Sequence, residues 1–248
     1  MNNFKSNLSY PIALFTGISI AKGILASLCL VTFTFGNVPA GLGSAPHASQ
    51  PSSRISSSRV KYKTIRIDGL DIFYGEAGDP AKPTILLLHG FPTSSFMFRN
   101  LMPLLADNYH VVAPDYPGFG QSSMPEVNEF EYTFENLTNV VDKFTQELKL
   151  TKYSIYVQDY GSPIGFRLAV KHPERIQAII LQNGNAYENG LSEAAAPLKT
   201  YGETGDEKIG DALKGFLKLE TTKFQYLHGA KNPALISPDT WTLDQIGL

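Results

Sequence analysis

The sequence predicts an α/β fold with a mostly parallel sheet and helices on both of its faces. Several short apolar runs each end in a glycine-containing loop, as strands buried on both faces of a parallel sheet do: PTILLLHG, YHVVAPDYPGFGQS, YSIYVQDYG and IQAIILQNG. Amphipathic stretches lie between them at 95–106, 133–148 and 163–172, and this alternation indicates parallel strands connected by helices. The 248 residues are 43% hydrophobic and 18% charged, which suits one globular domain.

The folded part is expected to begin near Lys61 with a pair of strands. KTIRIDGLDIFYGEAG is typical of a hairpin that turns at Asp68 and Gly69. The buried strands and the helices named above follow in order. After Asn183 the pattern changes to helical and polar segments, among which LKGFLKLETTKFQYL is amphipathic, and no further buried strand is predicted before Leu248.

Residues 1–40 differ from the rest and are predicted to be a signal peptide or a membrane anchor. Basic residues precede the apolar run GILASLCLVTFTFG, which is short for a membrane span but matches the hydrophobic region of a signal peptide. Val38 and Ala40 are small residues of the kind a signal peptidase accepts, so export as a periplasmic or secreted protein is favoured. An uncleaved anchor and a misassigned start codon are the alternatives. Residues 41–60 follow as a Ser/Pro-rich linker.

The charge balance favours a small-molecule substrate. The formal net charge is −2, which gives no electrostatic attraction toward nucleic acid or anionic lipid. We therefore expect no nucleic-acid partner, and contact with a membrane only through an uncleaved N-terminal segment. Cys29 is the single cysteine, so an intramolecular disulfide and a CxxC metal motif are excluded. No metal and no cofactor are expected.

Asp159 is the first candidate catalytic residue. In VQDYGSPIGFRLA a strand runs through a tight turn into a helix, with Gly161 just past the turn and Gly165 allowing the helix to pack close to the sheet. This pattern predicts a nucleophile elbow with Asp159 at its centre. A carboxylate needs no base to activate it and can attack a saturated carbon, forming an ester. The alternative is that Asp159 caps the following helix.

Two further loops follow strands that precede this elbow. In HGFPTSSFMFRN, Gly90 and Pro92 shape a loop whose backbone N–H groups could face the elbow. Taken alone, the motif is also compatible with a plain turn between a strand and a helix. DYPGFGQS supplies a third turn-rich loop after the next strand. The three loops in this order are much more specific than any one of them.

Together these motifs resemble the α/β-hydrolase fold, in the branch of epoxide hydrolases and haloalkane dehalogenases, where the nucleophile is aspartate. HGFP, DYPGFGQS, VQDYG and KHPERI carry the resemblance, which runs from about residue 62 to 190. It implies a partial α/β-hydrolase core at 61–185 and the start of a helical cap at 186–248.

The resemblance also implies roles for particular residues. Asp159 would be the nucleophile, and the backbone N–H groups of Phe91 and Tyr160 would form the oxyanion hole. His89 and Gly90 would shape the oxyanion loop, with His89 structural rather than a proton carrier.

Epoxide hydrolysis is favoured over dehalogenation within this branch. Dehalogenases usually hold the halide with a Trp just after the nucleophile and often with an Asn after His-Gly, whereas this chain has Tyr160 and Phe91 there. HGFP is closer to the epoxide hydrolases, which protonate the opening oxide with cap tyrosines. VQD, in contrast, resembles the dehalogenases. The possible proton donors in the expected cap segment are Tyr187, Tyr201 and Tyr226.

Hydrolysis of the ester requires a histidine held by an acid, which in the family follow the last two strands. Beyond Asp159 only His172 and His228 remain, in KHPERI and in FQYLHGAKNP, and neither is expected to be catalytic. The sequence therefore predicts an enzyme chain whose last strands are missing, truncated within the cap and inactive as given. A natural binding protein that kept the pocket is the second hypothesis. Without further strands, IQAIIL is expected to form an exposed apolar edge.

Overall fold

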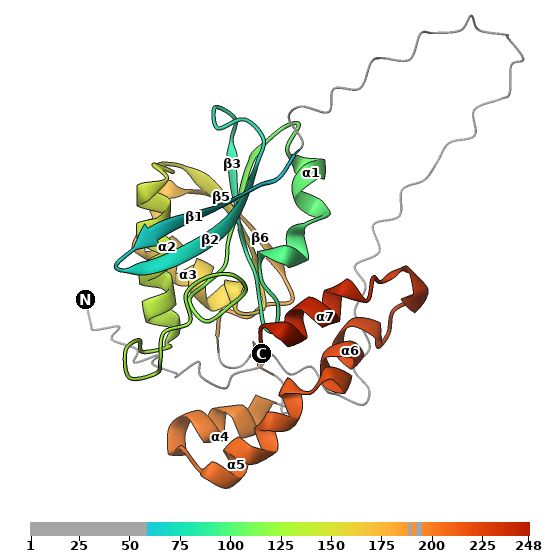
Figure 1. Ribbon diagram of the computed structural model, residues 1–248. Coiled ribbons are helices and arrows are strands. Elements are labelled where there is room, and N and C mark those ends of the chain that lie inside the picture. Colours follow the sequence, from blue (N-terminus) through green and yellow to red (C-terminus); the bar gives the residue numbers. More distant parts are fainter. Residues whose placement is uncertain (1–58, 188–189, 192–194) are drawn as a thin grey trace, which may run out of the picture.

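The computed structural model describes residues 59–187, 190–191 and 195–248 (Figure 1). The predicted signal peptide or anchor at 1–40, and nearly all of the linker at 41–60, lie outside these residues. Within the described ranges, no helix combines the length and the apolar character that crossing a bilayer requires.

The described strands form one mostly parallel sheet, as predicted. Its order is β1-β2-β4-β3-β5-β6. The first two strands form an antiparallel hairpin and β2 pairs antiparallel with β4, whereas β4, β3, β5 and β6 run parallel to one another. The strands are β1 (Lys61–Ile67), β2 (Leu70–Ala77), β3 (Thr84–Leu88), β4 (His110–Pro114), β5 (Tyr153–Gln158) and β6 (Ile176–Gln182).

Helices cover both faces of this sheet (Figure 1). Helices α2 (Phe134–Glu147) and α3 (Gly161–Lys171) pack on one face, against Leu86 and Leu88 among others. The 3₁₀ helix η1 (Ser95–Phe98) and the short helix α1 (Leu101–Leu105) pack on the other face, against Ile85 and Leu87. Successive residues of β3 therefore face opposite cores, which explains its continuous apolar sequence.

Local signals in the sequence account for the start of several elements. Asp68 and Gly69 have φ values of 50° and 87°, the left-handed pair that a two-residue hairpin turn requires. Helix α2 begins after Thr133, whose side chain accepts a hydrogen bond from Asn136 N at 3.1 Å.

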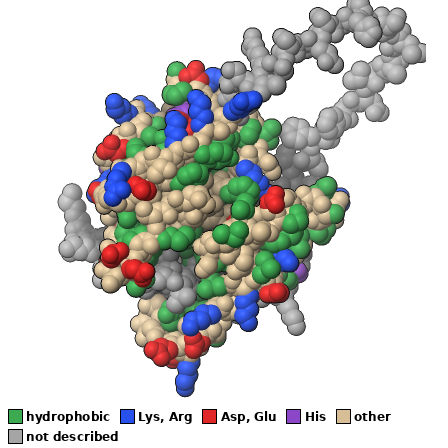
Figure 2. Space-filling model, in the orientation of Figure 1, with side chains coloured by type: hydrophobic (Ala, Val, Ile, Leu, Met, Phe, Trp, Pro, Cys, Tyr) green, Lys and Arg blue, Asp and Glu red, His purple; other side chains and the backbone are tan. Residues whose placement is uncertain are grey.

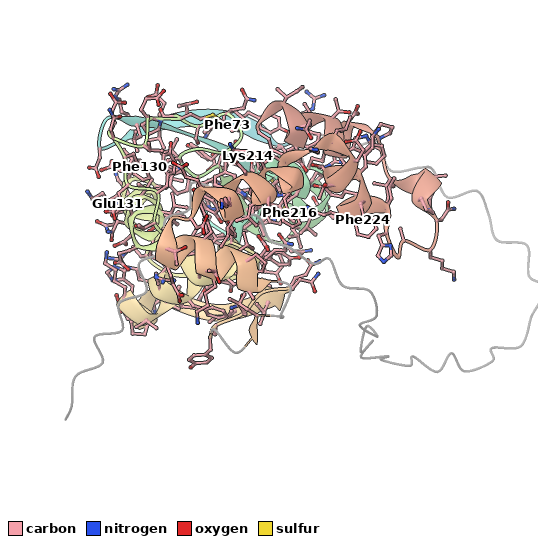
Figure 3. All side chains as sticks on the ribbon, turned by 90° about the horizontal axis from the view of Figure 1, so that it is seen from below. Phe73, Phe130, Glu131, Lys214, Phe216 and Phe224 are labelled. Atoms are coloured by element: carbon pink, nitrogen blue, oxygen red, sulfur yellow. The ribbon has the colours of Figure 1, made fainter. Side chains whose placement is uncertain are left out.

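The segment after β6 is helical, as predicted. Figure 1 shows its helices below the sheet, and Figure 3, seen from below, shows them in front of the core, with Lys214 and Phe216 over its centre. Helices α6 and α7 pack on each other, as do α4 and α5. The elements are α4 (Ala196–Thr204), α5 (Glu207–Leu213), η5 (Lys214–Leu217), α6 (Leu219–Leu227), η6 (Pro233–Leu235) and α7 (Asp239–Ile246).

Strand β6 forms the exposed apolar edge that the sequence predicts. Among the described strands it pairs with β5 alone. Ile179, Ile180 and Leu181 are 44%, 45% and 52% exposed. On the face of the molecule seen in Figure 2, acidic and basic side chains are interspersed with apolar ones, without a large area of one charge.

Candidate active site

Asp159 lies at the sharp turn between β5 and α3. Its φ is 49°, in the left-handed region that residues with a side chain rarely adopt. Strand β5 ends at Gln158 and helix α3 begins at Gly161, so the turn has the strand, turn and helix geometry of a nucleophile elbow. Asp159 is thus placed at the carboxyl end of a central strand, where parallel α/β sheets bind their ligands.

Two glycines allow α3 to pack directly on the sheet. A Cβ on Gly161 would lie 2.2 Å from the main-chain oxygen of Leu88, and a Cβ on Gly165 would lie 2.4 Å from Cγ1 of Val157. Both distances are well inside van der Waals contact, so a larger residue at either position would push the helix away from the strands. The close packing expected for Gly165 is present.

Two backbone N–H groups converge on the carboxyl group of Asp159. Phe91 N donates to Oδ1 at 2.9 Å, and Tyr160 N is the second donor. Gly90 lets the loop approach this closely, since a Cβ there would lie 2.4 Å from Cβ of Asp159. The structure therefore brings together the carboxyl group predicted to be the nucleophile and the two N–H groups predicted to form the oxyanion hole.

Burial dominates the electrostatics of Asp159. Loss of hydration raises the pKa of its carboxyl group, and the hydrogen bonds from the Phe91 and Tyr160 backbone counteract this only in part. Asp159 carries its charge only above this raised pKa. Once charged, it is a poorly hydrated carboxylate in a site of fixed dipoles, which favours attack on carbon.

The side chain of Asp159 does not cap helix α3. Tyr160 occupies the N-cap position, and no side chain forms a capping hydrogen bond there. The main-chain oxygen of Asp159, rather than its carboxyl group, accepts from Ser162 N at 2.9 Å. The carboxyl group instead reaches across to the loop after β3, so the capping alternative has no support in the structure.

His89 is fully buried and its ring is held between main-chain groups. Its Nδ1 donates to the main-chain oxygen of Gly90 at 2.9 Å, and its Nε2 faces Tyr116 N at 3.4 Å. The Tyr116 ring stacks on the imidazole with 4.0 Å between ring centroids. Burial lowers the pKa of His89, which favours the neutral ring that these two contacts require. The structural role expected for His89 stays a prediction, and these contacts are compatible with it.

Asp115 joins two of the predicted loops, a role that no motif in the sequence indicates. Its Oδ1 accepts from Ser95 N at 2.7 Å and its Oδ2 accepts from Gln121 N at 2.9 Å. Its main-chain oxygen accepts from the Ser122 hydroxyl at 2.8 Å. A Cβ on Gly120 would lie 2.1 Å from Oδ2, so the glycine allows this wrapping. One buried carboxylate thus fixes DYPGFGQS against η1.

Aromatic side chains enclose the elbow. The Tyr160 ring lies 5.9 Å from the ring of Phe91, 6.3 Å from that of Phe119 and 5.1 Å from that of Phe134, measured between centroids. The Tyr160 hydroxyl is buried and has no hydrogen-bond partner among the described residues. These rings give the elbow an apolar wall in which Tyr160 and Phe91 present no side-chain N–H group.

A cavity of about 330 Å³ opens between the core loops and the helices at 196–248, which are called the cap from here on. Phe91 and Thr93 line its core side, and Leu243 and Asp244 line its cap side. Asp159 itself does not line this cavity, but Phe91, whose N–H group it binds, does. The elbow therefore lies behind the loop that follows β3, next to the cavity wall.

Asp244 on helix α7 is a second buried carboxyl group at this cavity. It is 5% exposed, and its Oδ2 accepts a hydrogen bond from the Tyr226 hydroxyl. Burial raises the pKa of Asp244, although Tyr226, Thr93 and Arg99 act to lower it. Sequence reasoning missed Asp244, because a single acidic residue in the helical segment TWTLDQIGL looks like an ordinary surface residue.

The three tyrosines suggested as cap proton donors do not line the cavity. Tyr187 is 78% exposed. Tyr201 lies on α4, with its ring beside Gly210. The Tyr226 hydroxyl is engaged with Asp244, and burial together with this carboxylate raises the Tyr226 pKa, which weakens it as an acid. Their proposed role stays a prediction.

The histidines have partners away from Asp159. His172 Nε2 lies 2.9 Å from Asp142 Oδ2, and the His228 ring stacks on Phe224 at 4.4 Å between centroids. His110 is bonded to Glu76 and Thr84. Within 59–248, apart from the masked positions, no histidine is hydrogen-bonded to Asp159, and no group of metal-ligating side chains is found.

Comparison with known proteins gives matches to several hydrolases. A family profile described as alpha/beta hydrolase fold matches residues 83–205. An uncharacterized hydrolase of Saccharomyces cerevisiae is 45% identical over 195 residues, which is 77% of this chain and 67% of the yeast protein. A haloalkane dehalogenase of Mycobacterium marinum is 39% identical over 116 residues, which is 46% of this chain and 39% of the dehalogenase.

A solved structure matches in fold. The crystal structure of an epoxide hydrolase from Vigna radiata has a TM-score of 0.60 at 22% sequence identity, covering 77% of this chain and 68% of that chain. The chain thus spans about two thirds of the yeast hydrolase and less than half of the dehalogenase.

Proposed function

The chain belongs to the α/β-hydrolase family, and we propose that within this family it uses Asp159 to open epoxides through an alkyl-enzyme ester. The observation that carries the proposal is the carboxyl group at the elbow, with Phe91 N at 2.9 Å from Oδ1 and Tyr160 N as second donor. Serine at an elbow suits acyl transfer, whereas a carboxylate suits attack on a saturated carbon.

The reaction follows from this geometry. Oδ2 of Asp159 attacks an epoxide carbon, the ring bond between that carbon and the epoxide oxygen breaks, and the released alkoxide oxygen takes a proton from solvent. Oδ1 becomes the carbonyl oxygen of the ester while still held by the N–H group of Phe91, with the N–H group of Tyr160 at the same carboxyl group. When water attacks this ester, negative charge develops on the same oxygen, where both N–H groups stabilise it.

An epoxide is favoured over a haloalkane because of the side chains around the elbow. A departing halide needs donors, and Tyr160 and Phe91 offer aromatic rings at the two positions where dehalogenases usually carry Trp and Asn. Haloalkane dehalogenation is the second candidate, supported by the name of the Mycobacterium marinum relative.

Hydrolysis of the ester needs activated water, and the described residues bring no histidine to Asp159. We therefore propose that this chain forms the ester faster than it hydrolyses it, giving at most one product per protein molecule. A protein that binds small molecules without reacting is the alternative, and it predicts no covalent product.

Mass spectrometry of the protein after incubation with a small terminal epoxide tests the proposal. We expect a single adduct with the mass of the epoxide, mapped by peptide analysis to Asp159. The matching 1-bromoalkane is run in parallel, since faster labelling by the bromide would favour the dehalogenase alternative.

Asp159→Asn is the control, because it keeps the side-chain shape and removes the nucleophile. An adduct that persists in this variant, or that maps to another residue, would contradict the proposal. If any product is released in heavy-oxygen water, the label must enter the Asp159 carboxyl group rather than the first-turnover diol.

A further inference from the structure

The cap wall of the cavity contains a carboxyl group whose close partners are neutral. Asp244 is buried, lines the cavity and accepts a hydrogen bond from the Tyr226 hydroxyl. The Thr93 hydroxyl, on the facing core loop, is its other hydrogen-bonding neighbour. Hydroxyl groups orient a carboxylate but do not neutralise it, so a charged Asp244 is costly in this position.

Arg99 compensates the charge of Asp244 only from a distance. Its guanidinium donates to Thr240 Oγ1 at 3.0 Å and to the main-chain oxygen of Phe96 at 3.1 Å, and it lies 4.2 Å from the centroid of the Phe96 ring. In the part of the chain described by the structure, no basic side chain forms a salt bridge with Asp244. The balance of these effects leaves the pKa of Asp244 raised.

The rest of the described cavity lining also suits a cation. It contains no Lys, Arg or His side chain, and a second carboxylate, Glu126, lies at its exposed part. The aromatic rings of Phe91, Phe119 and Tyr132 face the same space. Carboxylates combined with aromatic faces form the usual surroundings of bound ammonium groups.

We propose that Asp244 makes the cap side of this cavity a binding subsite for an ammonium group carried by the substrate. The subsite rests on the proposed function, because it places the charged end of a substrate beyond the carbon that Asp159 attacks. A quaternary or protonated amine bound here would be the cationic partner that the Asp244 carboxylate does not find among its close neighbours. Asp244 is thus a specificity-determining residue, selecting electrophiles with a cationic tail over neutral ones of equal size.

Two epoxides of the same length test this subsite, one ending in a trimethylammonium group and one in the isosteric, neutral tert-butyl group. The rate of Asp159 adduct formation is measured for each by intact-protein mass spectrometry. We expect the cationic probe to react about tenfold faster, as a charge-assisted contact would give. Asp244→Asn, which retains an acceptor for Tyr226, should lower this ratio to near one.

Glu131→Gln is the matched control. Glu131, labelled in Figure 3, is exposed and does not line the cavity. Its substitution by Gln removes the same single negative charge as Asp244→Asn does. Its rate ratio should equal that of the unmodified protein. A ratio near one in the unmodified protein, or an unchanged ratio in Asp244→Asn, would overturn the inference.

A binding measurement separates failure of the subsite from failure of the chemistry. Tetramethylammonium should bind the unmodified protein, and sodium at equal ionic strength should not, as followed by thermal shift. If neither epoxide labels Asp159, the proposed reaction is wrong. The binding of tetramethylammonium then tests the subsite by itself. Absence of tetramethylammonium binding, or equal binding by Asp244→Asn, would refute it.

Discussion

Strands β3 and β6 are both rich in branched apolar residues, yet their surroundings are opposite. Every residue of β3 is buried, between α2 and α3 on one face and η1 and α1 on the other. In β6, Ile179, Ile180 and Leu181 are about half exposed. Neighbouring elements, rather than the apolar sequence of a strand, therefore determine whether that strand is buried.

The two strands are also held in place by different forces. Strand β3 is paired on both edges, with β4 and β5, and packed by apolar side chains on both faces, whereas β6 pairs on one edge with β5 and is anchored at its start by a polar network. In this network Asp142 on α2 bonds His172 at 2.9 Å and Arg175 at 3.0 Å, just before β6 begins. The site lies between the two strands, because Asp159 follows β5.

The largest expected difference between the strands concerns loss of an apolar side chain. Leu86→Ala removes a fully buried side chain of β3 and should lower the free energy of unfolding by about 3 kcal/mol, through lost burial and an unfilled cavity. Ile180→Ala in β6 should cost less than about 1 kcal/mol, because Ile180 is already 45% exposed. Urea unfolding of both variants measures the difference, and equal costs would contradict the comparison.

Asp142→Asn should weaken the polar anchor of β6 by about 1 to 2 kcal/mol. Burial acts to raise the pKa of Asp142, but hydrogen bonds from Gln146, Lys171 and His172 lower it from 3.8 to about 2. The stabilisation is therefore complete above the unfolded-state value and is lost as the pH falls toward 2. Unfolding curves at pH 7 and pH 2.5 should show a larger difference between variant and unmodified protein at pH 7.

Asp159→Asn should increase stability while abolishing ester formation. The pKa of Asp159 in the folded state is raised above its value in the unfolded state. The contribution of Asp159 to the free energy of unfolding is therefore fully present below the unfolded-state pKa, and it is lost as the pH rises through the folded-state pKa. Ionisation of Asp159 in this poorly hydrated position is unfavourable, so Asp159→Asn should raise the free energy of unfolding at neutral pH by on the order of 1 kcal/mol. A melting temperature that rises at pH 7 but not near pH 3 supports this, and a fall at pH 7 would contradict it.

Ile180→Lys should have the smallest effect on stability, within about 0.5 kcal/mol, since the side chain is half exposed. It should nevertheless reduce self-association, because a charge on an exposed edge strand opposes pairing with another chain. Analytical ultracentrifugation compares the variant with the unmodified protein. Thr200→Lys on the exposed part of α4 is the matched control and should leave association unchanged.

The sequence predicted the centre of the molecule better than its cap. Gly165 could be predicted because the helix after a buried strand packs so closely that only glycine fits. Asp159 could be predicted because it stands at the centre of the turn between that strand and the helix. The segment at 95–106 was expected as one amphipathic stretch but forms η1 and the short α1. Asp115 holds the start of η1 through Ser95 N, a contact between loops that no local pattern reveals.

The role of Asp244 could not be predicted for a similar reason. Its burial depends on how α7 meets Thr93 and Arg99 of the core, more than 100 residues earlier in the chain. Tyr226 is predicted as a possible proton donor to the substrate, but the packing of α6 on α7 directs its hydroxyl group to Asp244. Contacts of this kind arise from tertiary packing rather than from periodicity.

The carboxylate of Asp115 also makes the core side of the cavity rigid. Because it binds Ser95 N and Gln121 N at once, the two core loops cannot separate without leaving a buried charge unpaired. The cap is joined to these loops by side-chain contacts such as that of Arg99 with Thr240. We expect any widening of the cavity to come from movement of α7 and its neighbouring helices rather than from the two core loops.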